Sequence, residues 1–233
     1  MKKLKLITFV GTSLFEHYYY GKGKDSERRH YNNLAKQLHP FGHWAYPKIK
    51  QDLQEVEDTV TRGGVIWQDD ECSAEIRSIL KIYNEIKMPL EVFLIATDTV
   101  LSVQAALLVK EWFTPDKNHC PHINIHFSLP NVDFATQGKS LHIVKDLNFA
   151  KGNHYRVGVQ NLRQLLEKQL GMAQKPKDFV LNITAGYKAI TPLLTLLAYQ
   201  HGIPLYYMYH ETNALSAVPL IEYNLKDLKQ FIK

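Results

Sequence analysis

Residues 178–201, DFVLNITAGYKAITPLLTLLAYQH, decide the fold because they join a buried strand to a helix. A short apolar run at 179–183 has the length of a buried strand, and apolar residues then recur at helical spacing from Ile190 to Tyr199. In an open α/β sheet, ligands bind beyond the carboxyl ends of the strands, where loop amides and helix N-termini favour anions. The loop between this strand and helix, which ends in Lys188, is therefore a candidate anion site.

Lys188 stands at an unfavourable place for an ordinary helical residue. A lysine in the first turn of a helix opposes the helix dipole. Pro192 lacks an amide donor, and its ring clashes with the carbonyl of Lys188 if both residues belong to a regular helix. A Gly-x-Lys sequence by itself is a weak motif that also fits a tight turn beside a solvated lysine. Taken together, these points predict that Lys188 lies in a special turn.

The overall composition is that of a globular protein with an anionic ligand. The chain has 233 residues, of which 45% are hydrophobic and 22% are charged, which is typical of a soluble domain with a real core. Its 28 lysines and arginines exceed its 23 acidic residues, so the formal net charge is +5 and the sequence pI is about 9.0. This excess suits an anionic ligand but is too small to require a long nucleic acid.

Cysteine usage and hydropathy indicate a cytoplasmic location. The two cysteines, Cys72 and Cys120, fit free thiols in a reducing compartment better than a disulfide scaffold. The apolar stretch at residues 6–10 is shorter than the hydrophobic region of a signal peptide. No apolar run approaches the roughly 20 residues that cross a bilayer, so we expect no membrane association.

The first candidate binding loop follows the first predicted strand. Residues 4–10 form an apolar run that predicts this strand. The loop that comes directly after it consists of Gly11, Thr12, Ser13 and Leu14. An ordinary turn with a hydroxyl cap remains an equal alternative, because serine and threonine are common caps.

A second candidate loop follows another buried strand, predicted at residues 90–96. It consists of Thr97, Asp98 and Thr99 and lies immediately before an amphipathic segment at 100–113. Asp98 or Thr99 would also serve as an ordinary helix N-cap, which is the strong alternative here. The position is nevertheless a polar loop at the carboxyl end of a strand, like the other two loops.

An aromatic and basic segment at residues 16–33 allows two interpretations. Three consecutive tyrosines at 18–20 could stack on bases while the following lysines and arginines contact phosphates. A solvated surface loop is the favoured interpretation, because most runs of charge are solvated. The GKGK sequence at 21–24 is not a phosphate-binding P-loop, because Glu16 occupies the place of the first glycine.

Histidines near residue 120 suggest zinc at first sight, but the pattern favours a strand. His119, Cys120, His122 and His126 do not have the spacing of a standard zinc site. His122 and His126 alternate with apolar residues over 122–127, which is typical of a half-exposed strand. We therefore predict no metal site and no cofactor.

The remaining pattern predicts an α/β fold in one domain that covers residues 1–233. Further helices are predicted at 51–61, 71–87 and 155–170, and further strands at 204–209 and 218–223. Residues 129–152 receive no assignment. Strands that alternate with helices indicate a Rossmann-like, mostly parallel sheet flanked by helices on both faces.

The three loops together resemble the CRISPR-associated Rossmann-fold (CARF) family. The shared motifs are GTS at 11–13, TDT at 97–99 and NITAGYKA at 182–189. The resemblance covers essentially the whole chain and is strongest to the stand-alone archaeal-type ring nucleases. It implies a homodimer that binds cyclic tetra-adenylate across its two-fold axis and cuts it. One departure is Ala185, which stands where a second glycine is expected.

The resemblance also implies roles for individual residues. Ser13 and Lys188 correspond to the catalytic residues of the family. The ligand-binding residues would come from the three loops, namely Gly11, Thr12, Leu14, Thr97, Asp98, Thr99, Thr184, Ala185, Gly186 and Tyr187. In the implied reaction each ribose 2′-hydroxyl attacks its own adjacent phosphate, so the protein has to position groups and stabilise charge. Lys188 would neutralise the phosphorane, and Ser13 would hold the 2′-hydroxyl or a phosphate oxygen.

A non-catalytic sensor of cyclic oligoadenylate is the alternative function. In that case the chain would be the ligand-binding part of a CRISPR effector or regulator. None of the six arginines has a histidine at the Arg-x4-6-His spacing of CARF effectors of the ribonuclease type. Degradation of the second messenger is therefore the favoured interpretation. The apolar residues on more than one face of the helix after Lys188 favour the dimer, because a helix that covers a sheet needs one apolar stripe.

Overall fold

The computed structural model describes residues 3–16, 25–37, 51, 73–114, 120–129, 142–147, 152–186 and 188–208. Several sequence predictions lie outside these residues: the strand at 218–223, the helix at 51–61 beyond residue 51, and the positions of Cys72, His119 and Tyr187.

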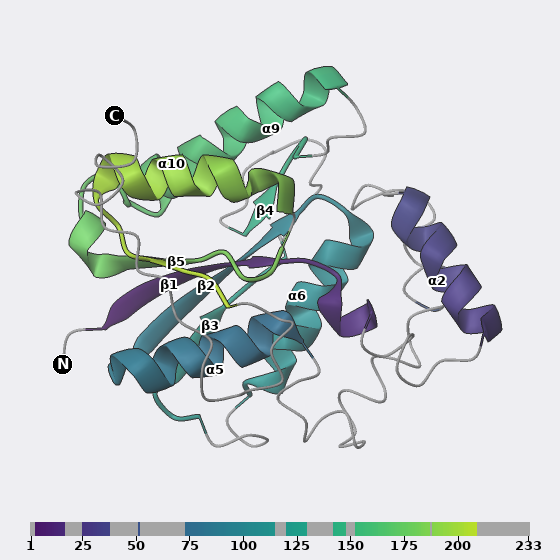
Figure 1. Cartoon of the computed structure of the whole chain (residues 1–233), viewed down its shortest axis with the longest axis horizontal. Helices are drawn as coiled ribbons and strands as arrows, with labels where there is room; N and C mark the ends of the chain where they lie inside the picture. The colour runs from purple at the N-terminus through teal and green to yellow at the C-terminus, as the bar shows by residue number, and fades with distance from the viewer. Residues whose placement is uncertain are drawn as a thin grey trace.

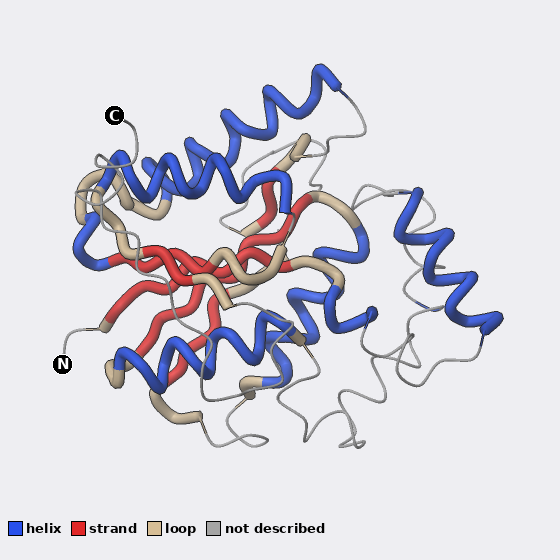
Figure 2. Tube along the Cα trace, in the orientation of Figure 1, coloured by secondary structure: helices blue, strands red, loops and turns tan. Residues whose placement is uncertain are grey.

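A parallel sheet forms the centre of the described structure (Figure 1, Figure 2). Its strand order is β3-β2-β1-β5-β6, and β4 also pairs with β2. Every one of these pairings is parallel. The strands are β1 (Leu4–Val10), β2 (Leu90–Thr97), β3 (Ile123–His126), β4 (Ile143–Val144), β5 (Phe179–Asn182) and β6 (Leu205–Tyr206). The predicted α/β fold with a mostly parallel, Rossmann-like sheet is confirmed.

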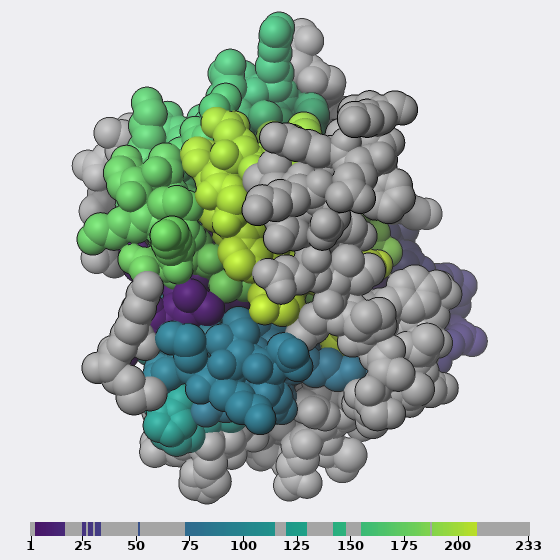
Figure 3. Space-filling view, turned by 60° about the vertical axis from the view of Figure 1, so that its left-hand side comes forward, coloured from purple at the N-terminus to yellow at the C-terminus, as the bar shows by residue number. Residues whose placement is uncertain are grey.

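Helices cover both faces of the sheet, as a parallel sheet requires. Two of them, α5 (Ala74–Ile86) and α6 (Val100–Trp112), lie on one face, and α9 (Gly152–Gln164) and α10 (Thr191–His201) lie on the other (Figure 1). In the space-filling view the blue surface of α5 and the yellow-green surface of α10 lie on opposite sides of the purple amino-terminal residues (Figure 3).

The strand β1 is central because its side chains supply both hydrophobic cores. Leu6 and Val10 belong to the core cluster that also contains residues of α5 and α6. Ile7 and Phe9, which point to the opposite face because strand side chains alternate, belong to the cluster that contains residues of α10. Because its side chains alternate in direction, β1 contributes to the hydrophobic cores on both faces of the sheet.

The structure corrects two predictions along the chain. Residues that the sequence placed in a surface loop form the helix α2 (Asp25–Gln37), in which Tyr31 is buried against Phe15 with ring centroids 6.4 Å apart. The long helix predicted to end at residue 170 changes instead to a π-helix at Leu165–Gln169. In the unassigned stretch, β4 forms as a two-residue strand.

The turn predicted around Lys188 is present. A 3-10 helix, Lys188–Ile190, precedes α10, and the proline of the first turn of α10 follows it. Lys188 thus lies outside the regular helix, where Pro192 does not clash with its carbonyl. Gly186 has a φ of 88°. A Cβ atom on Gly11 would lie 3.2 Å from the backbone of Gly186, so the loops after β1 and β5 touch through their glycines.

We expect Gly186→Ala to lower the free energy of unfolding by about 1 to 3 kcal/mol more than Gly202→Ala. Both glycines have positive φ, so both substitutions carry the cost of a left-handed alanine. Only at Gly186 would the new Cβ lie 2.5 Å from the Cβ of Phe9, whereas nothing lies within 4 Å at Gly202. Urea denaturation of the two variants measures the difference, and equal losses would contradict the close packing of this loop on β1.

Candidate functional site

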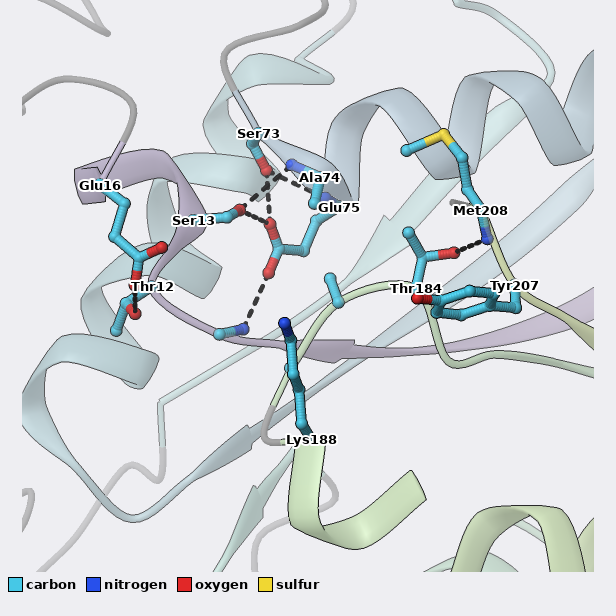
Figure 4. Close-up of a pocket in the computed structure, with 13 residues that line it drawn as sticks. Thr12, Ser13, Glu16, Ser73, Ala74, Glu75, Thr184, Lys188, Tyr207 and Met208 are labelled. Carbon is cyan, nitrogen blue, oxygen red and sulfur yellow. Dashed lines mark hydrogen bonds between the residues drawn. The ribbon is translucent and has the colours of Figure 1, made fainter. Parts of the chain in front are cut away.

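A cavity of about 420 Å³ lies where the loops after β1 and β5 meet the start of α5 (Figure 4). The position is the one expected for a ligand site in a parallel α/β sheet, at the carboxyl ends of adjacent strands. The cavity is lined by Gly11, Thr12, Ser13, Glu16, Ser73, Ala74, Glu75, Thr184, Ala185, Gly186, Lys188, Tyr207 and Met208. Five of the predicted ligand-binding residues and the two predicted catalytic residues are among them.

The carboxylate of Glu75 connects the loop after β1 to the start of α5. One of its oxygens, Oε1, accepts from the backbone N–H of Gly11 at 2.8 Å. The other oxygen, Oε2, accepts from Ser13 Oγ at 2.5 Å and from Ser73 Oγ at 2.6 Å. Glu75 is 1% exposed. Its position in the first turn of α5 also places this negative charge at the positive end of the helix dipole.

Ser13 occupies a fixed position on the cavity wall. Besides donating to Glu75, its Oγ accepts from the backbone N–H of Ala74 at 3.1 Å. Ser73 is the N-cap of α5, and its Oγ accepts from the N–H groups of Glu75 and Ile76. The first helical amides of α5 are therefore all used to hold this corner of the cavity, as helix N-termini need such acceptors.

Lys188 approaches the same cavity from the opposite wall. Its side chain is exposed and extends toward the side of the cavity that holds Glu75 (Figure 4). Among the residues that the structure describes, Lys188 forms no hydrogen bond or ion pair. Its ammonium group is thus available to an anionic ligand, and it is the one lysine among the lining residues.

Buried polar groups hold the loop after β5. Asn182, which is fully buried, donates through Nδ2 to Ser78 Oγ at 2.8 Å and accepts through Oδ1 from the N–H of Thr184 at 3.1 Å. Thr184 Oγ1 in turn accepts from the N–H of Met208 at 2.9 Å. Because buried polar groups need partners, this network fixes the path of the loop that leads to Lys188.

The loop after β2 does not line the cavity. Thr99 caps α6, since its Oγ1 accepts from the N–H of Ser102 at 3.4 Å, and Thr97 Oγ1 lies 3.0 Å from Thr99 Oγ1. Asp98 Oδ2 accepts from the N–H of Asp146 at 3.0 Å, and burial raises the pKa of this carboxyl above its ordinary value. The helix-cap alternative is therefore present, and a contact of these residues with a ligand stays a prediction.

Leu14 is another predicted binding residue that does not line the cavity. Its side chain is 1% exposed and belongs to the hydrophobic core, so a contact of Leu14 with a ligand stays a prediction. Sequence adjacency to Ser13 placed it among the binding residues, but its side chain packs inward. Tyr187, the remaining predicted binding residue, lies outside the described part of the chain.

The sequence analysis missed the residues that organise the cavity. Glu75 and Ser73 lie at the start of a helix that was predicted only for its apolar face. Tyr207 and Met208 lie within the strand predicted at 204–209 but beyond the end of β6. The available signal was an acidic residue two positions after a capping serine. Glu75 meets Gly11 and Ser13 only in the folded chain, so the sequence pattern alone does not reveal these contacts.

Within the described residues, no group of three histidine, cysteine or acidic side chains is placed to hold a metal ion. Nor does that part of the chain contain a helix with the length and apolar character of a membrane span.

Comparison with known proteins identifies a family for this chain. A family model described as CRISPR-associated protein (Cas_APE2256) matches residues 70–221, more than half of the chain. The chain therefore belongs to this CRISPR-associated family. No curated protein matches the sequence. The match confirms the CRISPR association that the resemblance implied, whereas the activity stays a prediction.

We expect Glu75→Ala to lower the free energy of unfolding by about 2 to 4 kcal/mol, because buried donors lose a charged acceptor. Glu85→Ala is the matched control, since Glu85 lies exposed on the same helix. Its effect should stay within about 0.5 kcal/mol. Urea denaturation measures both variants. If the two glutamates gave equal losses, Glu75 would not tie the loop after β1 to α5.

Proposed function

From this family membership, we propose that the protein is a ring nuclease that binds cyclic tetra-adenylate and cleaves it without a metal ion. One observation carries the proposal: Ser13 and Lys188, selected from distant parts of the sequence, line one cavity. A hydroxyl and a lysine at the carboxyl ends of parallel strands suit a phosphodiester ligand. The products would be linear oligoadenylates with 2′,3′-cyclic phosphate ends, and their formation would switch off CRISPR second-messenger signalling.

The proposed reaction uses a nucleophile that belongs to the substrate. A ribose 2′-hydroxyl attacks the adjacent phosphorus in line, the P–O5′ bond breaks, and a 2′,3′-cyclic phosphate and a 5′-hydroxyl form. Lys188 stabilises the negative charge that develops on the phosphorane oxygens and is the proton donor for the leaving 5′-oxygen. Such positioning and charge stabilisation account for large rate enhancements without a cofactor.

The charge of the cavity supports a site shared by two subunits. Among the described residues that line it, each cavity has one lysine together with the carboxylates of Glu16 and Glu75. Thr12 Oγ1 donates to Glu16 at 2.9 Å, and Glu75 is enclosed by its donors. A cyclic tetra-adenylate carries one phosphate per nucleotide, so one lysine compensates little of its charge. A two-fold dimer would bring two copies of Lys188 to one ring.

The helix α10 supports the same dimer. Three of its apolar residues are buried, whereas Leu196 is 65% exposed. Interfaces bury contiguous apolar surface, and Leu196 is the exposed apolar residue of α10 at which the proposed contact can be tested. An isologous contact through α10 would bury Leu196 in the dimer interface. It would also place the two cavities on the same side of that interface.

Lys188→Ala should lower the cleavage rate by about 100- to 1000-fold, because a transition-state charge contact is lost. The fold should be unaffected, since Lys188 is exposed. Ser13→Ala should lower the rate by about 10- to 100-fold, since positioning is shared with loop amides. Lys177→Ala is the matched control: Lys177 is exposed before β5, at the opposite end of that strand. Single-turnover cleavage measures all three, and a wild-type rate for Lys188→Ala would refute the assignment.

Cleavage should continue at an undiminished rate in EDTA, and its products should end in 2′,3′-cyclic phosphate. The reason is that the nucleophile and the charge stabilisation both come from groups other than a metal. Chromatography of the products with authentic standards is the measurement. A requirement for magnesium or products with 5′-phosphates would contradict the mechanism, and binding without any cleavage would favour the sensor alternative.

The protein should behave in solution as a dimer with a mass near twice 26.9 kDa. Titration should give one cyclic tetra-adenylate for two chains, because a ring with two-fold symmetry matches an isologous site. Leu196→Asp should shift the protein toward monomer, since it places a charge in the proposed contact. Light scattering and calorimetry provide the two numbers, and a monomer that binds one ring per chain would exclude the shared site.

A further inference from the structure

Ser13 already donates its only hydrogen. In the 2.5 Å contact Ser13 Oγ is the donor and Glu75 Oε2 the acceptor, as a serine hydroxyl and a carboxylate require. The N–H of Ala74 occupies one of the two lone pairs of Ser13 Oγ. One lone pair remains, and Ser13 lines the cavity. Toward a ligand, Ser13 is therefore a hydrogen-bond acceptor.

This polarity decides which ligand group can meet Ser13. A phosphate oxygen is an acceptor, and two acceptors without a hydrogen between them repel each other. A ribose 2′-hydroxyl, in contrast, can donate to the free lone pair. Of the two roles that the sequence left open for Ser13, the hydrogen bonds of Glu75 thus select contact with the 2′-hydroxyl.

Glu75 has a structural role in joining the loop after β1 to α5, and its place beside Ser13 suits it to a chemical role as well. A carboxylate that is 1% exposed is costly to bury. Within the described residues, it forms no ion pair with a lysine or an arginine, and three hydrogen-bond donors hold it instead. Glu75 lines the cavity directly behind Ser13, where a proton acceptor for a hydroxyl nucleophile is useful.

We propose that Glu75 is a positioning residue that makes Ser13 the acceptor of the ribose 2′-hydroxyl and receives, through Ser13, the proton which that hydroxyl loses. The inference rests on the proposed ring cleavage and names the route of its proton. The 2′-oxygen bonds to phosphorus while its proton passes to Ser13 Oγ, and the hydrogen of Ser13 passes to Glu75 Oε2. The P–O5′ bond breaks, and the 5′-oxygen takes a proton from Lys188.

The sum of these transfers is balanced. Glu75 ends protonated, Lys188 ends neutral, and Ser13 ends unchanged, so one proton has moved from the 2′-oxygen to the 5′-oxygen across the site. Solvent restores both residues after the product leaves. Cleavage then requires an ionised Glu75, which gives the rate a decline on the acidic side of its pH profile.

The test is the pH profile of single-turnover cleavage for the wild type, Glu75→Gln, Glu75→Asp and Ser13→Ala. Glu75→Gln should lose about 100-fold in rate near neutral pH, within the range for general acid–base catalysis. It should also lose the acidic decline, which Glu75→Asp should retain. Glu85→Gln, on the exposed face of α5, is the control and should match the wild type at each pH. Circular dichroism verifies the folding of every variant.

Ser13→Ala keeps the inference testable if Glu75→Gln does not fold, and the double variant adds a test if it does. Ser13→Ala should also lack the acidic decline, since the route to Glu75 is broken. In the Ser13→Ala background, Glu75→Gln should change the rate by less than about 3-fold, because the two residues act as one unit. An acidic decline that persists in Ser13→Ala would overturn the inference. A wild type that cleaves no ring would instead overturn the proposed function itself.

Discussion

The buried carboxylate of Glu75 is the interaction on which the geometry of the cavity depends. It gathers donors from the loop after β1 and from the cap of α5, and so joins two segments that are far apart in the sequence. The close contact of Gly11 with Gly186 then brings the loop after β5 against the first loop. Ser13 and Lys188 face one space because both constraints act together. The parallel sheet places the ends of β1 and β5 side by side. The hydrogen bonds of Glu75 and the contact between the two glycines then fix the loops around the cavity.

The charges of Glu75 and Lys188 suit reversible binding of an anion in the cavity. Glu75 is sequestered by its donors, whereas the ammonium group of Lys188 points into open space. The exposed lysine can attract a phosphodiester, while the carboxylate is shielded from it. In the proposed reaction, the group that stabilises charge, Lys188, is therefore separate from the group that accepts a proton, Glu75. In the proposed dimer, each subunit would supply one such set of groups to the cyclic ligand.

The sequence predicted the elements whose signal is local. The apolar run of β1, the strand and helix around Lys188, and the special turn before Pro192 all follow from periodicity and backbone rules, and the structure contains them. The missed features depend on contacts between distant residues. Glu75 gains its importance from its hydrogen bond with Ser13, and the side chain of Leu14 packs in the core although the residue is adjacent to Ser13 in the sequence. The helix α2 was missed because its charges masked the burial of Tyr31.

Incubation of the pure protein with cyclic tri-, tetra- and hexa-adenylate, with separation of the products, tests the central claim most directly. The proposed function, in which Ser13, Glu75 and Lys188 act around one cavity, predicts that cyclic tetra-adenylate is converted to linear oligoadenylates. It also predicts that this conversion is lost together with the lysine in Lys188→Ala. If none of the three rings is bound or consumed by the folded wild-type protein, the account of this cavity as a ring-nuclease site is contradicted.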